Sequence, residues 1–138
     1  MKTTYVYIHK GLTFYIALGT WIQMFLAGIW HAEVVSTPEA HIFFGLSLLL
    51  ASLLALIAAF AGKLPQPVIK RTAVLFLLIL AQPLLIETRR TGLPLVSALH
   101  PVNAAFIGFT AGRLVAMIGG GHKESVVAET AVAPAAGD

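Results

Sequence analysis

The sequence predicts an all-α integral membrane protein, an up-down-up-down bundle of four helices, and three observations support this class. The 138-residue chain is 58% hydrophobic and only 11% charged, which leaves too little polar surface to cover a water-soluble globule. The connections between its apolar segments are short, which favours antiparallel neighbours. The apolar residues themselves fall into four blocks, Leu12–Trp30, Ile42–Gly62, Thr72–Ile86 and Val102–Ile118. We therefore expect a transmembrane domain over residues 1–121 and a mobile cytoplasmic tail over residues 122–138.

The first two helices have clear sequence boundaries. The first is expected from about Tyr5 to Trp30, with Trp30 at the outer membrane interface and Tyr5 and Tyr7 near the inner one. The second is expected to start after Thr37, which can cap it, because proline is tolerated at the first helical position and Glu39 complements the positive helix end. The second helix is expected to end at Gly62. Because it starts just after Thr37, His41 lies about one turn inside it.

Prolines delimit the third and fourth helices. Lys63–Arg71, with Pro65 and Pro67, is expected to form a short cytoplasmic turn before the third helix. Pro83 inside that helix frees a backbone carbonyl. The fourth helix is expected to begin around His100-Pro101, because a residue before proline disfavours helical geometry. In a bundle of this order the first and third helices are diagonal, and so are the second and fourth. No repeat of fixed period is visible, although the second and fourth helices both begin with a histidine.

The basic residues predict the orientation of the chain in the membrane. One set of helix ends carries Lys2, Lys10, Lys63, Lys70, Arg71 and Lys123, whereas Arg89 and Arg90 flank the other set. By the positive-inside rule both termini are cytoplasmic. Arg113 is expected to reach the cytoplasmic head groups. This topology explains a pI near 9.5 without a nucleic-acid partner, and the absence of cysteine excludes disulfides, iron–sulfur clusters and thioether-linked haem.

Two histidines are the leading candidates for a functional site. His41 and His100 begin diagonal helices on the outer side, and an ionisable side chain beside hydrocarbon indicates a function by default. Diagonal helices can present imidazoles to opposite faces of haem b, with both histidines as axial metal ligands. Gly45 and Ala104, one turn further on, would leave space for the flat macrocycle. The alternatives are interfacial histidines beside glycines that serve helix packing, or a role with another metal or a quinone.

Other polar residues can support this site. Gln23 and Gln82 lie on the other diagonal pair of helices, where they either bond to each other or serve haem propionates, a histidine nitrogen or a quinone carbonyl. Asn103 is expected to hold a nearby imidazole or to cap its helix. Arg89 and Arg90 would neutralise propionates or anchor the outer loop.

Two further groups of residues are weaker candidates for metal binding. His31, Glu33 and Glu39 have the chemistry of a zinc site, but their irregular spacing favours an exposed loop. His9 and His122 would lie at the inner face, in principle as a second histidine pair.

Four motifs carry a resemblance to known proteins: Gln23–Gly28, His41-x-x-x-Gly45, Gln82 and Leu99–Ala104. Together, from about Thr4 to Ile118, they resemble a widespread family of small four-helix bacterial membrane proteins of uncharacterised function. Leu-His-Pro-Val-Asn-Ala is the most specific of these motifs. The histidine pair is also similar in architecture to one half of the haem A synthase family, whose four-helix halves hold a haem between such histidines. The resemblance implies a multi-pass protein of the bacterial inner membrane.

The sequence thus predicts a membrane b-type cytochrome, or a cytochrome-like subunit, with haem near the outer face between the second and fourth helices. The expected function is electron transfer with a quinone or an external redox protein, within a larger membrane complex, because so small a bundle has little room for independent catalysis. The competing prediction is a non-redox accessory subunit that only packs against such a complex. Ser47, Ser52, Thr20 and Thr110 lie among apolar residues with no paired base at helical spacing, so no hydrolytic site is expected there.

Overall fold

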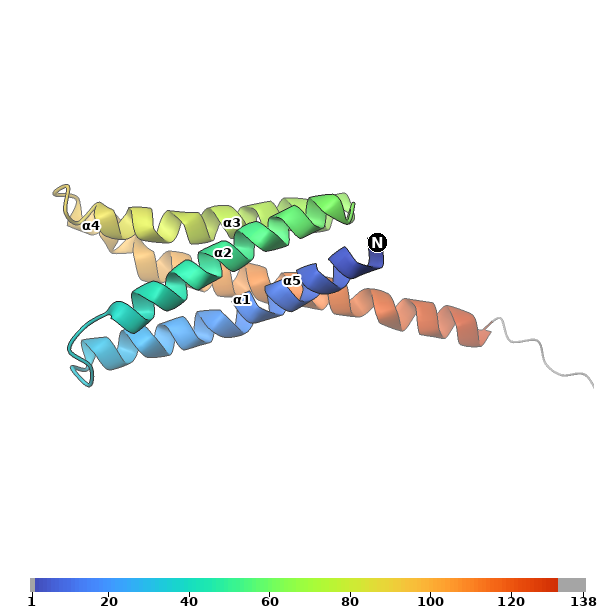
Figure 1. The fold of residues 1–138 in the computed structure, drawn as a ribbon, viewed down its shortest axis with the longest axis horizontal. Helices are drawn as coiled ribbons and strands as arrows, with labels where there is room; N and C mark the ends of the chain where they lie inside the picture. Colours follow the sequence, from blue (N-terminus) through green and yellow to red (C-terminus); the bar gives the residue numbers. More distant parts are fainter. Residues whose placement is uncertain (1, 132–138) are drawn as a thin grey trace, which may run out of the picture.

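The computed structural model describes the backbone of residues 2–131 and the side chains of residues 3–118. Within this part of the chain all regular secondary structure is helical, and no strand is present. The helices are α1 (Lys2–His31), α2 (Glu39–Ala61), α3 (Gln66–Glu87), α4 (Pro94–Ser97) and α5 (Leu99–Ala131) (Figure 1). Four of them, all except the short α4, are long and apolar enough to cross a membrane. The expected all-α class is therefore confirmed for the described residues.

The four long helices pack as a ring of neighbours around one core. α1 packs against α2 and α5, and α3 packs against the same two helices, so that α1 and α3 are diagonal, as are α2 and α5. Figure 1 shows the α1–α2 connection and α4 at one end of the bundle, with the start of α1 and the α2–α3 turn at the other. This arrangement brings the start of α2, the start of α5 and the ends of α1 and α3 to the same end.

The helix boundaries agree with most of the local signals in the sequence. α2 begins at Glu39 and its last turn is followed by Gly62, but the expected cap is wrong: Pro38 occupies the N-cap position and makes no side-chain hydrogen bond. The expected turn is too long: α3 already begins at Gln66, because Pro67 is tolerated in the first turn, where a missing N–H costs nothing. Pro83 lies in the interior of α3. The outer connection contains the additional one-turn helix α4.

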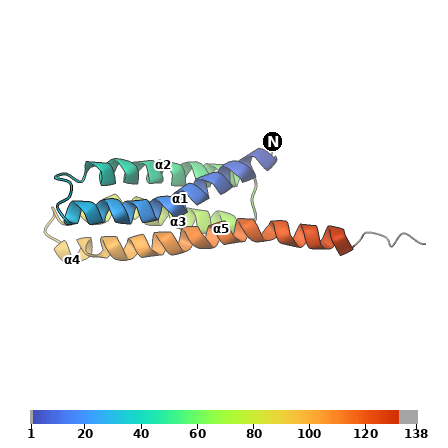
Figure 2. The same cartoon turned by 90° about the horizontal axis from the view of Figure 1, so that it is seen from below.

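α5 is longer than its apolar block. It continues beyond Ile118 and through Gly119-Gly120-Gly121 to Ala131, and Figure 2 shows this extension reaching past the ends of the other helices. Glycine is an unfavourable helix residue but not a forbidden one, so the three glycines do not terminate the helix. The last part of the expected tail, residues 132–138, lies outside the described residues.

The core contains a repeat, and the expectation that the chain has none is wrong. His100 follows His41 by 59 residues, and Gln82 follows Gln23 by the same number. At this offset buried positions coincide: His9 with Val68, Thr13 with Thr72, Ile16 with Leu75, Thr20 with Ile79, Leu48 with Ile107, Ser52 with Ala111 and Ala55 with Leu114. The Thr13 and Thr72 hydroxyls each donate to the carbonyl four residues earlier. The α1–α2 and α3–α5 hairpins are therefore structurally equivalent halves.

The packing of the helices follows the same repeat. Exchanging the two hairpins replaces α1 by α3 and α2 by α5. The α1–α2 pair then becomes the α3–α5 pair, and the α2–α3 pair becomes the α5–α1 pair, and all four pairs are packed. The bundle is thus approximately two-fold symmetric in its contacts, with the two histidines at equivalent positions.

Candidate functional site

A cavity of about 480 Å³ lies between all four long helices, at the end of the bundle that carries the α1–α2 connection. Its volume falls within the range of about 300–1,000 Å³ that is typical of small-molecule and cofactor sites. Most of its walls are apolar, with Leu49, Ile79 and Ile107 among them. Its polar lining includes both leading histidines and both glutamines, so the structure brings together residues that lie far apart in the sequence.

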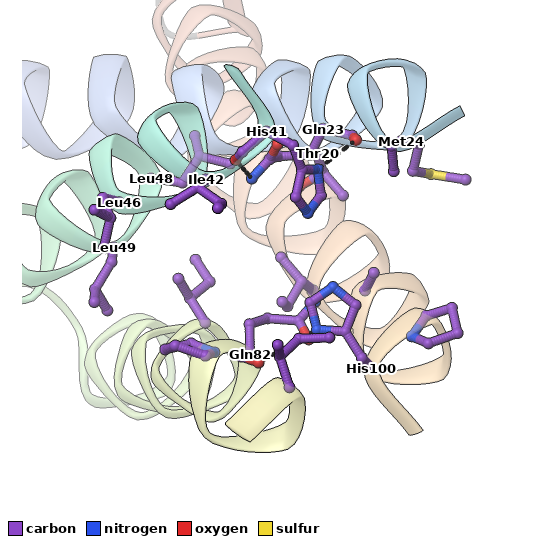
Figure 3. A pocket seen from close by; sticks show the side chains of 18 of the residues that line it. Thr20, Gln23, Met24, His41, Ile42, Leu46, Leu48, Leu49, Gln82 and His100 are labelled. Atoms are coloured by element: carbon purple, nitrogen blue, oxygen red, sulfur yellow. Dashed lines mark hydrogen bonds between the residues drawn. The ribbon is translucent and has the colours of Figure 1, made fainter. Parts of the chain in front are cut away.

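The two histidines face each other across this cavity. Figure 3 shows the imidazole of His41 on α2 and that of His100 on α5 pointing toward each other. Their ring centroids are 6.2 Å apart and their planes are inclined by 57°. Both residues are half-buried, as expected for groups that line a cavity open at one end.

Each imidazole is fixed by a backbone carbonyl of the preceding helix. Nδ1 of His41 donates to the Gln23 carbonyl oxygen at 3.2 Å, and Nδ1 of His100 donates to the Gln82 carbonyl oxygen at the same distance. A carbonyl oxygen only accepts hydrogen bonds, so Nδ1 carries the proton in both rings. The lone pair of each Nε2 is then available to a ligand or a metal.

The separation of the rings fits coordination of one metal ion from both sides. An imidazole nitrogen binds a metal at about 2.0–2.1 Å and lies about 1 Å from the centre of its ring, so two such rings on opposite sides have centroids about 6 Å apart. The observed 6.2 Å agrees with this distance. The inclination of 57° is compatible with it, because each ring is free to rotate about its metal–nitrogen bond.

The two glutamines hold the site through their backbones, not through a bond to each other. The Gln23 amide Nε2 donates to the His41 carbonyl oxygen at 3.0 Å. Oε1 of Gln23 and Oε1 of Gln82 are both buried without a hydrogen-bond partner among the described residues. Both glutamines line the cavity, and buried polar atoms ordinarily have a partner, so a bound group or an ordered water would satisfy these two acceptors.

Gly45 makes room for a protein side chain. A Cβ atom at this position would lie 2.5 Å from Nε2 of Gln23, so the glycine lets the amide approach α2. Residue 104, the equivalent position in the second hairpin, is an alanine, and no bond from the Gln82 amide to the His100 carbonyl forms among the described residues. Gly45 and Ala104 both line the cavity, but the space expected below the first imidazole is shared with Gln23.

Asn103 and the two arginines contribute less to the site than the histidines. Asn103 donates from Nδ2 to the Leu78 carbonyl oxygen at 2.8 Å and so ties α5 to α3, without a bond to the imidazole. Arg90 lies at the mouth of the cavity, where its side chain is exposed and pairs with Glu87 at 3.5 Å. Arg89 is exposed and does not line the cavity.

The weaker metal candidates are not brought together. His31, Glu33 and Glu39 are exposed, and within the described residues no cluster of three or more histidine, cysteine or acidic side chains is able to hold a metal ion. His9 is completely buried near the opposite end of the bundle, where its Nε2 lies 2.9 Å from the Thr72 hydroxyl oxygen. The side chain of His122, its suggested partner, lies outside the described residues.

The two hairpins share one spacing around the site that is visible in the sequence. In both hairpins the histidine follows the glutamine by 18 residues. This shared spacing places the glutamine carbonyl opposite the histidine across each helix pair, whatever the residue types in between. The backbone carbonyls themselves carry no sequence signal.

The fold and the cavity together define the protein as a four-helix bundle with a two-histidine site at one end. No family model, curated protein or solved structure matches this chain.

Proposed function

We propose that this protein is a membrane b-type cytochrome, or a cytochrome-like subunit, that holds haem b between His41 and His100. The observation that carries the proposal is the 6.2 Å separation of two facing imidazoles whose Nδ1 atoms are both held by backbone carbonyls. The apolar cavity of about 480 Å³ and the two unpartnered glutamine oxygens support a bound group at this place.

The proposal includes insertion in the bacterial inner membrane, with an up-down-up-down topology and both termini in the cytoplasm. Its support is the four apolar helices and the exposure of large apolar side chains along them. Phe14, Trp21, Phe43 and Phe109 are each more than half exposed, which hydrocarbon favours and water does not. In this orientation the histidine cavity lies near the outer face.

The residues of the chain would position and tune the bound group. The Gln23 and Gln82 carbonyls fix the tautomer and the orientation of each imidazole and leave the lone pair of Nε2 free for the bound group. The apolar side chains of Leu49, Ile79 and Ile107 line the cavity and would limit the access of water to the bound group. Arg90 at the mouth is placed to pair with a propionate. The bound haem would supply one-electron exchange.

With His41 and His100 both holding the haem, the bound group would supply electron transfer and not binding of an external ligand. The partner would be a quinone or an external redox protein that approaches the mouth of the cavity, and the bundle would work within a larger membrane complex. A non-redox accessory subunit that only packs against a larger membrane complex would not need a cavity with two facing imidazoles.

The reduced absorption spectrum tests this proposal. The protein, expressed with an adequate haem supply and purified, is expected to show a sharp reduced α band. His41→Ala and His100→Ala should each abolish or shift this band to a similar extent, because the two ligands are structurally equivalent. His9→Ala and His31→Ala are the matched controls, because neither side chain lines the cavity, and both should leave the band unchanged.

A wild-type protein without haem would contradict the proposal and favour the accessory subunit. A band that survives both His41→Ala and His100→Ala would place the haem elsewhere. Sensitivity of the band to His31→Ala alone would move the site to the outer loop.

A further inference from the structure

A second cavity, of about 620 Å³, lies between α3 and α5. It shares no lining residue with the histidine cavity. Lys70 and Arg71, in the second turn of α3, line it on one side, and Arg113 of α5 lines it on the other. It therefore lies toward the end of the bundle that carries the α2–α3 turn, opposite the histidines. We call it the basic groove.

Among the side chains that the structure describes, those of residues 3–118, no carboxylate compensates the positive charge of the basic groove. The acidic residues between positions 3 and 118 are Glu33, Glu39 and Glu87, all at the histidine end. The ion pair among these side chains joins Arg90 to Glu87 and involves no residue of the groove. Three cations that share one groove without a carboxylate repel one another, so an anion bound there lowers the free energy.

All three cations also lie within the apolar spans. Lys70 and Arg71 belong to the candidate span Gln66–Glu87, and Arg113 belongs to the candidate span Pro94–Ile118. They lie near the ends of these spans that the proposed topology puts at the cytoplasmic face, where basic side chains reach the head groups of that leaflet. Val74 and Phe109, which line the same groove, are 50% and 70% exposed and give it an apolar wall.

The internal repeat shows that the fold does not require this charge. The positions equivalent to Lys70, Arg71 and Arg113, 59 residues earlier, are Gly11, Leu12 and Leu54. The corresponding surface of the α1–α2 hairpin is therefore uncharged, although the two hairpins bury equivalent positions. The basic groove departs from the symmetry of the bundle, as a site with a ligand of its own would.

We propose that the basic groove binds an anionic phospholipid of the cytoplasmic leaflet, with its phosphate between Arg71 and Arg113. A guanidinium binds phosphate oxygens through paired N–H donors, and basic pockets between membrane helices are typical sites for anionic head groups. Val74 and Phe109 would contact the first part of an acyl chain, which a free phosphate ion lacks. This inference rests on the proposed insertion in the membrane but does not depend on haem.

Lipid retention tests the inference. The full-length protein is reconstituted in phosphatidylcholine nanodiscs with graded amounts of phosphatidylglycerol, and the phosphatidylglycerol that remains bound is measured by native mass spectrometry. Arg71→Gln with Arg113→Gln should weaken retention about ten-fold or more. Lys10→Gln with Lys63→Gln removes the same charge from exposed positions outside the groove and should change retention less than about two-fold.

Three outcomes would overturn the inference. Equal losses in both double variants would show a general effect of surface charge. Equal retention in the wild type and both double variants would show that no site exists, and displacement of the lipid by millimolar inorganic phosphate would show a small-anion site.

A further control separates a lost site from a misfolded protein. Arg71→Lys with Arg113→Lys keeps the charge and should retain most of the lipid binding. A chain that stays in the supernatant of vesicles would instead refute membrane insertion, and with it both proposals.

Discussion

At the scale of single residues, the histidine cavity depends on the close approach of α1 to α2 and of α3 to α5. The imidazoles are held by carbonyls at identical distances of 3.2 Å, whereas the glutamine side chains differ between the two halves. The difference follows from one methyl group, because Gly45 of the first hairpin is replaced by Ala104 in the second. Only the glycine leaves space for a glutamine amide to reach the histidine backbone.

Relative to Gly28→Ala, the substitution Gly45→Ala is expected to destabilise the protein by about 1 kcal/mol. Both changes gain the same helix propensity, but only the methyl group at position 45 displaces the Gln23 amide from the His41 carbonyl. The measurement is chemical unfolding in detergent. Gly28→Ala is the matched control: a Cβ atom added there would have no neighbour within 4 Å, so it should be neutral or stabilising by up to about 1 kcal/mol through helix propensity. Equal effects of the two substitutions would show that Gly45 has no special packing role.

At the scale of helices, one buried hydrogen bond joins the diagonal pair α1 and α3. The Thr72 hydroxyl donates to the Val68 carbonyl, so it accepts from Nε2 of His9. Nδ1 of His9 is left without a partner among the described residues. The equivalent residue in the first hairpin, Thr13, bonds only to the carbonyl of His9 in its own helix.

Thr72→Val is therefore expected to cost about 1–3 kcal/mol, because it leaves the buried Nε2–H of His9 without an acceptor. Thr13→Val should cost less than about 1 kcal/mol, because the carbonyl that loses its hydroxyl donor remains bonded within the helix. Thermal unfolding of both variants provides the comparison. A Thr13→Val effect as large as that of Thr72→Val would mean that the cross-bundle bond contributes nothing.

At the scale of the whole molecule, the charges and the histidine cavity lie at defined ends of the bundle. Lys63, Lys70, Arg71 and Arg113 lie toward the end opposite the histidines, where the positive-inside rule places the cytoplasm. The basic groove and the cavity would then face different sides of the membrane.

Reporter fusions test this orientation. A reporter at Asp138 should be cytoplasmic and one inserted at Gly92 external, because the basic residues flank the ends proposed to be inside. Activity of a paired cytoplasmic and periplasmic reporter gives the readout at both positions. An external reporter at Asp138 would place the histidine cavity on the cytoplasmic side and exclude an external redox partner.

Much of the fold was predictable from local properties of the sequence. The length and hydropathy of each apolar block determine a helix long enough to span a membrane, and Pro38, Glu39, Gly62 and Pro67 determine where helices begin or end. The nomination of His41 and His100 as a pair also needed only the sequence, since both occupy the starts of diagonal helices. That they face each other across one cavity is a property of the packed bundle.

Other features were decided by tertiary structure alone. The groups that hold the imidazoles are backbone carbonyls, which every residue possesses, so no residue type marks them. The repeat was hard to see because most equivalent core positions share burial and not identity, as Ile16 and Leu75 or Ala55 and Leu114 do. Arg71 and Arg113 share a groove only because α3 packs beside α5. Local sequence determines which segments are helices and which residues are reactive, whereas contacts between distant helices determine what those residues can bind together.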